Sequence, residues 1–187
     1  MTDFKGERRT NQTHQSSTDP DAKLMRRGNG QPAKLCFGGH ALMGNRSGLC
    51  ADLQIIDPRM SEPKVAQRLL ARLRRKRIHA RTLGADKGYH SKAFVEHLRE
   101  RGVRPLIARI DGRRTPGLDG RTTRHASYRA SQGTRKRIEE IFGWLKTVGG
   151  MRRSRVIGVA RTQMQAYLAA SAYNLLRMSR LMPIGAS

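Results

Sequence analysis

The stretch that decides the fold is RTLGADKGYHSKAFVEHLRERGVRPLIARI, residues 81–110. Its opening residues predict a short strand that ends at Asp86. Ser91 is a typical N-cap for the helix that follows, and Gly102 is a typical C-terminal stop. A second strand is predicted over 103–110. A strand–helix–strand unit of this kind favours parallel pairing and an α/β fold.

Upstream of this unit the sequence predicts a hairpin and a helix. Residues 35–43 and 49–56 have the composition of strands, and the polar, Gly-rich residues 44–48 form the turn between them. Ser61 then opens an amphipathic helix with an apolar stripe on one side and arginines on the other. Residues 1–33 are polar, and we expect an N-terminal arm that is loop or disordered.

Downstream the chain changes character. Residues 111–134 are rich in Gly, Arg and Thr, and we expect an exposed basic insertion. Helices are predicted over about 134–147 and about 162–181. The last helix carries a stripe at alternating spacings of four and three, typical of core or partner-helix packing. The stripe consists of Met164, Leu168, Ser171, Leu175 and Met178.

The charge of the chain points to its partner. Lys plus Arg number 38 against 14 Asp plus Glu, a net charge of +24 in 187 residues. Such an excess destabilises a compact monomer by self-repulsion unless a polyanion takes it up, and nucleic acid is the usual polyanion. The alternative is a solvated basic surface. No apolar run reaches the roughly 18 residues of a membrane span, and Cys36 and Cys50 are expected as free thiols in a reducing cytoplasm.

Two acidic residues stand out against this basic background. Asp86 ends a predicted strand, at the sheet edge where α/β proteins bind ligands. Arg135, Glu139 and Lys146 fall within a helical stripe roughly 40° wide, at the border of the helix's apolar face. Two-metal phosphodiester chemistry needs carboxylates that converge on Mg²⁺. The structural alternatives are a turn aspartate and an amphipathic helix with surface ion pairs.

Several motifs together resemble the DDE transposases of bacterial insertion sequences, in the insertion-sequence-five and related groups. The resemblance extends over nearly the whole chain, with the motifs in the family's order. They are Ala85-Asp86-Lys87-Gly88-Tyr89, the Arg135…Glu139…Lys146 spacing, Phe142-Gly143-Trp144-Leu145-Lys146, and segments at 18–24, 34–40 and 149–153. The resemblance implies an RNase H-like mixed sheet flanked by helices over 34–182, two Mg²⁺ (or Mn²⁺) ions, and DNA cleavage with strand transfer.

Carried over residue by residue, Asp86 matches the second acid of the family and Glu139 the third, and both are implied metal ligands. Arg135 and Lys146 match the family's basic residues around that Glu. The family's Tyr, three residues before the Arg, falls at Gln132. Further contacts to the DNA backbone are expected from basic residues in the insertion and near the last helix. These are Arg113, Arg114, Arg152, Arg153 and Arg155.

The main departure from the family is the first acid. The family carries it on the first strand, in an Asp-Gly-Thr type motif, and no such motif precedes Thr18. Asp19, Asp21 and Asp52 are the alternatives within the chain. We expect the first strand to be missing, and the chain to be an inactive fragment that binds DNA and forms a homodimer or assembles with full-length transposase. The alternatives are a non-catalytic DNA-binding module or inhibitor, and a nuclease without strand transfer.

Two further groups of residues carry weaker signals. The spacing of the histidines does not fit a zinc site. Trp144 could stack on a base, but packing in the core is the stronger expectation. The histidines in question are His40, His79, His90 and His97.

Overall fold

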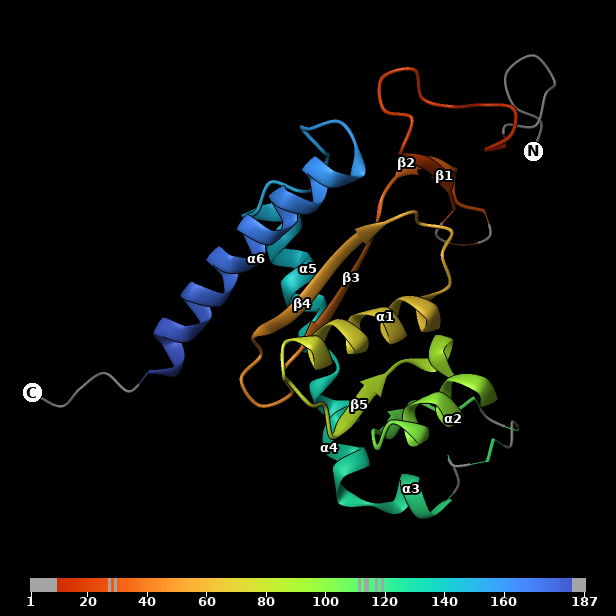
Figure 1. Ribbon diagram of the computed structural model, residues 1–187, viewed down its shortest axis with the longest axis vertical. Coiled ribbons are helices and arrows are strands. Elements are labelled where there is room, and N and C mark those ends of the chain that lie inside the picture. The colour runs from red at the N-terminus through yellow and green to blue at the C-terminus, as the bar shows by residue number, and fades with distance from the viewer. Residues whose placement is uncertain are drawn as a thin grey trace, which may run out of the picture.

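The computed structural model describes residues 10–26, 28, 30–110, 112, 115–116, 118 and 120–182, apart from the side chain of Arg121. Helices and strands form a mixed α/β arrangement, in which only the middle of the chain, from β4 to α3, alternates between the two (Figure 1). The strands are β1 (Lys23–Met25), β2 (Lys34–Cys36), β3 (Gly38–Met43), β4 (Cys50–Ile56), β5 (Thr82–Ala85) and β6 (Arg104–Ile107). The helices are α1 (Glu62–Arg75), the 3₁₀ turn η2 (Lys87–Tyr89), α2 (Lys92–Glu100), α3 (Gly120–Arg124), α4 (Ala126–Thr134), α5 (Arg137–Thr147) and α6 (Val159–Leu181).

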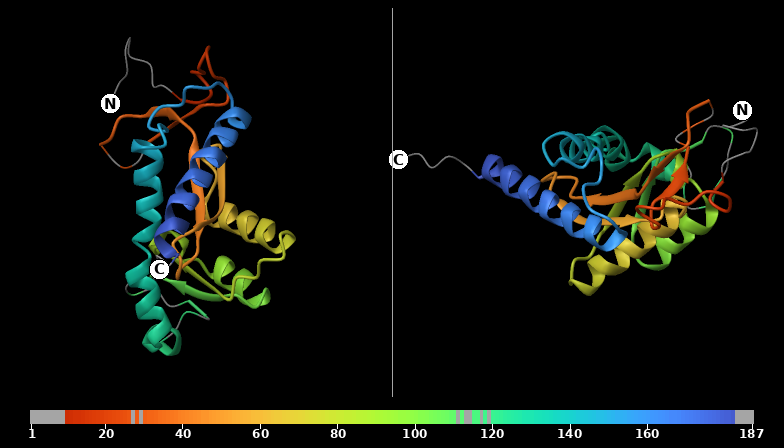
Figure 2. Two further views of the ribbon diagram at one scale, coloured as in Figure 1. Left: turned by 90° about the vertical axis from the view of Figure 1, so that its left-hand side faces the viewer. Right: turned by 90° about the horizontal axis from the view of Figure 1, so that it is seen from above.

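The predicted hairpin is confirmed as β3 and β4, which pair antiparallel. Side chains alternate between its two faces. Leu53 packs with Ile141 of α5 and Ala166 of α6 on one face. Ile56 packs with Val65 of α1 on the other. The hairpin is therefore the middle layer between α1 and the α5–α6 pair (Figure 2).

The predicted strand–helix–strand unit is also confirmed. β5 and β6 pair in parallel, and α2 connects them. The Ser91 hydroxyl accepts a hydrogen bond from the backbone N–H of Phe94, as expected for an N-cap. Phe94 belongs to the largest core cluster, which also includes Leu70 of α1 and Ala85 at the end of β5. Thus α1 and α2 cover a common hydrophobic core beneath the strand end that carries Asp86.

The predicted basic insertion is more ordered than an exposed loop. Its described part forms α3 and α4, and α4 packs on the β5–β6 pair. The Gln132 side-chain amide donates to the carbonyl of Leu106 at 2.8 Å. Ser131 is buried against Gly84, where an added Cβ would lie 2.4 Å from the Ser131 hydroxyl. These contacts explain why the polar composition of this segment did not predict a packed helix: polar side chains make the packing contacts.

The outer edge of β4 is covered by α6. The Gln163 side chain accepts from the N–H of Ile55 at 2.7 Å and donates to the carbonyl of Leu53 at 3.2 Å. Asn174 makes the equivalent pair of bonds with Cys50, at 2.8 and 2.9 Å. Covered edges cannot add another strand. β3 and β5, in contrast, each pair with a single strand among the described residues, so each keeps a free edge.

The polar arm is only partly irregular. It contributes β1, which pairs antiparallel with β2. Asp19 and Asp21 accept hydrogen bonds from the backbone N–H groups of Gly158 and Val159, at 3.2 and 2.9 Å. Carboxylates at a helix N-terminus satisfy free N–H groups and interact favourably with the helix dipole. The arm therefore anchors the start of α6.

Other expectations have mixed outcomes. Both cysteines are free thiols, as predicted. Trp144 packs edge-on against Tyr173 in the core, as predicted. The stripe of α6 is not core: Met164, Leu168 and Leu175 are more than 60% exposed. None of the described helices is long and apolar enough to cross a membrane.

Candidate functional site

Asp86 lies immediately after β5 and caps the 3₁₀ turn η2. Its carboxylate accepts a hydrogen bond from the N–H of Gly88 at 2.8 Å. The residue is exposed, although Ala85 just before it is buried. A buried strand end thus fixes the backbone, while the carboxylate stays accessible to a ligand. The sequence-based placement of Asp86 at a strand end is confirmed.

A second carboxylate, Glu62, lies beside Asp86. A Cβ added at Gly88 would be 3.1 Å from Asp86 Oδ1 and 3.2 Å from Glu62 Oε2, so the two carboxylates flank the same glycine. Displacement of water from Glu62 and the negative charge of Asp86 raise the pKa of Glu62. Burial raises the pKa of Tyr89, and the charges of Glu62 and Asp86 raise it further. Negative charge therefore gathers at this point of a strongly basic chain.

Sequence reasoning did not find Glu62. The residue stands in the first turn of α1, where an acidic side chain is expected merely as a helix-start signal. Its proximity to Asp86 arises because α1 packs against η2. The two residues are 24 positions apart in sequence, and no local pattern links them.

Glu139 occupies the first turn of α5 and is exposed. Ile141 and Leu145, on another side of α5, are buried against the hairpin, so the helix presents Glu139 to solvent. Lys146 is exposed in the last turn. That Asp86 and Glu139 converge on shared ions stays a prediction.

Arg135 lies at the junction of α4 and α5 and outside both helices. Arg135 and Lys136 have right-handed helical backbone angles, so α4 leads directly into α5. The Nη1 atom of Arg135 is buried and has no hydrogen-bond partner among the residues that the structure describes. A buried guanidinium nitrogen without a partner costs free energy, and an anionic ligand would supply the missing acceptor.

The donor set fits a divalent cation. Carboxylate oxygens are the ligands that Mg²⁺ prefers, and the structure brings two carboxylates together, those of Asp86 and Glu62. In the described parts of the chain, no three His, Cys, Asp or Glu side chains form a cluster that could hold a metal ion by itself. The present residues therefore suit a site completed by a further carboxylate, by water or by DNA phosphate.

The alternatives for the first acid are engaged elsewhere. Asp52 is buried, with its Oδ1 2.9 Å from Nη2 of Arg72 on α1 and 3.5 Å from Nζ of Lys76, the residue directly after α1. Arg72 also bonds the hydroxyl of Tyr167. Asp19 and Asp21 hold the start of α6, as described above. Each of the three has a structural role that its contacts explain.

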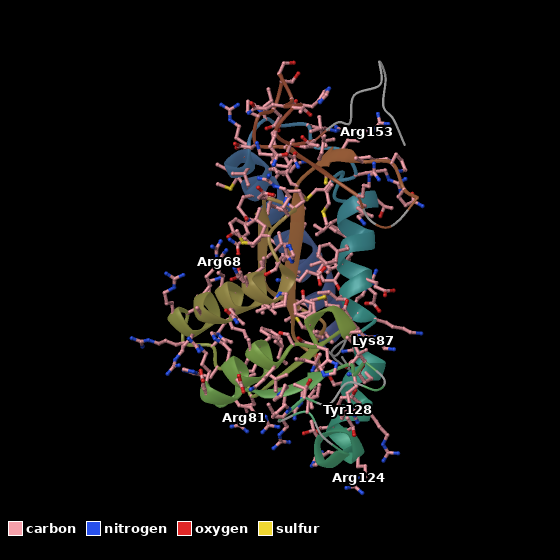
Figure 3. All side chains as sticks on the ribbon, turned by 90° about the vertical axis from the view of Figure 1, so that its right-hand side faces the viewer. Arg68, Arg81, Lys87, Arg124, Tyr128 and Arg153 are labelled. Atoms are coloured by element: carbon pink, nitrogen blue, oxygen red, sulfur yellow. The ribbon has the colours of Figure 1, made fainter. Side chains whose placement is uncertain are left out.

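The predicted DNA-binding arginines of the α5–α6 loop are exposed. They are Arg152, Arg153 and Arg155. Figure 3 shows Arg153, Lys87 and Arg124 at different heights along the side of the molecule that carries α4 and α5. Arg113 and Arg114 lie outside the described residues. Arg137, which we did not predict, donates to the carbonyls of Asn45 and Arg46 at 2.6 and 2.9 Å and ties α5 to the β3–β4 turn.

One of the four histidines, His90, has a structural role next to the candidate site. His90 is 2% exposed, and its Nδ1 accepts a hydrogen bond from the N–H of Ile110 at 2.9 Å. This bond joins the segment that follows β6 to the residue after η2, so His90 supports the segment next to Asp86.

Comparison with known proteins agrees with this arrangement. Residues 8–175 match the family described as Transposase DDE domain, which covers most of the chain, and the chain therefore belongs to this family. Membership implies a function in DNA transposition and the use of divalent metal ions. No curated protein and no solved structure matches the chain.

Proposed function

We propose that the chain supplies two of the three acids of a metal-dependent site for DNA cleavage and strand transfer, built on an RNase H-like fold. The observation that carries the proposal is the exposed Asp86 directly after the buried Ala85 that ends β5, with the carboxylate of Glu62 beside it. Asp86 and Glu139 would hold Mg²⁺ or Mn²⁺. When bound, paired ions activate the attacking oxygen and stabilise the leaving oxygen.

The third carboxylate would come from a strand that this sequence does not contain. A missing strand would have to pair at an open edge. The edges of β3 and β5 are free among the described residues, whereas the outer edge of β4 is covered by α6. The β3–β4 pair has α1 on one face and α5 on the other, and the β5–β6 pair has α2 on one face and α4 on the other. A strand between β3 and β5 would join the pairs into one sheet, and would place its residues beside the strand end that carries Asp86.

The basic residues near the acids have distinct tasks in this proposal. Arg135 and Lys146 hold phosphate oxygens and offset the charge that develops during cleavage. Arg113, Arg114, Arg152, Arg153 and Arg155 track the DNA backbone. The affinity should be mainly electrostatic and largely independent of sequence, and its logarithm should fall by about 0.9 per neutralised phosphate for each unit of log salt. Because its substrate is bacterial DNA, the protein would act in the cytoplasm.

On this proposal, the 187-residue chain by itself does not cleave DNA. Without a third carboxylate, Asp86 and Glu139 alone would hold the ions weakly, and the stabilisation that paired ions supply to cleavage would be lost. Such a chain would bind DNA without cleaving it, and could inhibit full-length transposase by occupying its DNA or by joining its assembly.

The test is complementation. The chain is assayed on supercoiled DNA with Mg²⁺, alone and joined at its N-terminus to a strand segment with an Asp-Gly-Thr motif. Strand cleavage should require the segment, its Asp and Asp86, whereas Asp86→Asn should leave DNA binding intact. Asp86-dependent cleavage by the chain alone would show that the first acid lies within it, and Asp52 would be the first residue to re-examine. Cleavage that survives Asp86→Asn would refute the site.

A further inference from the structure

Helix α6 has two apolar faces, and the structure covers one of them. The inner face packs on β4 and α5 through Ala166, Ala170 and Tyr173, all buried. The outer face carries large apolar side chains that are mostly exposed. They are Met164 (61%), Leu168 (66%), Leu175 (68%), Met178 (47%) and Met182 (68%), with the exposed Ser171 among them.

The spacing of these outer residues is that of a coiled-coil seam. From Met164 to Met182 the steps are four, three, four, three and four residues, with Ser171 at the third position. At about 100° per residue, all six positions fall within roughly 80° of one another on the helix surface. Figure 1 and the right-hand view of Figure 2 show α6 along the outside of the molecule, with its C-terminal end projecting beyond the strands. The seam is therefore accessible along its length.

The charge around the seam singles out its partner. The chain carries +24 overall, yet the charged residues of α6 are only Arg161, in its first turn before the seam begins, Arg177 and Arg180. None of them lies on the seam, and the Nε of Arg177 donates to the carbonyl of Ser47 at 2.8 Å. From Met164 to Met182 the positions beside the seam are uncharged; they are Gln165, Tyr167, Ala172, Asn174, Ser179 and Leu181. An acidic partner would find no complementary charge here, whereas a second copy would meet an identical uncharged surface.

We propose that the outer seam of α6 joins two copies of this chain as a helix pair about a two-fold axis. An apolar strip on a single helix is self-complementary, as an isologous interface requires. The strip is about 30 Å long at 1.5 Å per residue and about 10 Å wide. Two such strips bury less than the roughly 1,200 Å² of a stable interface. The structure therefore assigns a weak, reversible dimer.

The test is the mass of the full chain in solution, free of DNA. Sedimentation equilibrium is measured from about 1 to 200 μM in roughly 0.5 M salt, which screens the repulsion between the two basic copies. The wild-type chain should pass from one copy to two across this range. The double variant Leu168→Lys, Leu175→Lys should remain a single copy up to the highest concentration, a shift of at least tenfold in the dissociation constant.

A matched control adds the same two charges on other helices. Ala71→Lys with Ala93→Lys changes exposed residues of α1 and α2, and should leave the dimer unchanged. Because the substituted seam residues are exposed, both variants should keep the circular dichroism spectrum of the wild type. A wild-type chain that stays a single copy throughout would overturn the proposal and leave the seam to another segment or protein. A dimer that survives Leu168→Lys, Leu175→Lys would overturn it equally. Since no metal or DNA is present, this result is independent of the proposed catalytic site.

Discussion

Replacing Gly84 by alanine should test how α4 is held against the strand that leads to Asp86. Gly84 is in β5, two residues before Asp86, and its backbone is not in the left-handed region. The substitution is therefore free of backbone strain, and its effect comes from contact alone. An added Cβ would lie 2.4 Å from the Ser131 hydroxyl and 3.8 Å from the Ser131 Cβ.

The size of the effect follows from these two distances. A contact of 2.4 Å forces Ser131 or the whole of α4 to move, and overpacking of a buried site costs about 1 to 3 kcal/mol. The Ser131 hydroxyl is buried and has no hydrogen-bond partner in the described structure, so Ser131→Ala should leave stability unchanged or raise it slightly. With Ser131→Ala in place, the nearest atom to the new methyl group would be the 3.8 Å Cβ, an ordinary van der Waals contact.

Urea unfolding of the wild type, both single variants and the double variant forms a double-mutant cycle. Gly84→Ala should lower the free energy of unfolding by about 1 to 3 kcal/mol, and Ser131→Ala should restore most of that loss. If Gly84→Ala leaves the free energy of unfolding unchanged, or if adding Ser131→Ala does not restore the lost stability, α4 does not pack on β5 as described. The direct link from α4 to α5 would then no longer position Glu139.

Three further outcomes are expected. Asn174→Leu removes two hydrogen bonds from the edge of β4 and should lower the free energy of unfolding by about 1 to 3 kcal/mol. Gln165→Leu, on the same helix, removes a buried oxygen that has no partner among the residues that the structure describes, and should leave the free energy of unfolding unchanged in the same urea titration. Asp21→Ala removes the hydrogen bond from the N–H of Val159 at the start of α6 and should lower the free energy of unfolding by about 1 kcal/mol. A variant as stable as the wild type would argue against this contact. Burial and the charge of Asp52 raise the pKa of Cys50 to about 11. At pH 7 the thiolate of Cys50 should therefore be on the order of 100-fold scarcer than that of an ordinary cysteine. Alkylation of Cys50, measured in a Cys36→Ser background, should be slower by the same factor until the pH approaches 11.

Local patterns predicted the elements around the site well. The N-cap at Ser91 and the turn between β3 and β4 depend on residues close in sequence, and the structure has both. The parallel pairing of β5 and β6 followed from the length of the connection between them, because a helix must cross back over the sheet. Asp86 at a strand end could be predicted for the same reason.

Other features depended on contacts between distant segments and could not be predicted. Glu62 reaches Asp86 only through the packing of α1 on η2, and Asp21 reaches α6 across more than 130 residues. The stripe on α6 shows the limit of periodicity: spacing identifies an apolar face but not which of two faces is covered. The helical packing of 120–134 was missed because its contacts use Ser131 and Gln132, whose polarity predicts a loop.

The most direct test of the central claim, that Asp86 and Glu139 hold a common metal site, is the affinity for Mn²⁺ measured by electron paramagnetic resonance of the free ion. The titration covers the millimolar range, because binding without a third carboxylate should be weak. Asp86→Asn and Glu139→Gln should each weaken binding about tenfold or more. Glu140→Gln is the matched control, since the adjacent side chain points about 100° away on the helix, and it should change the affinity less than twofold. An affinity that Glu139→Gln leaves unchanged, or that Glu140→Gln lowers as much, would contradict the assignment.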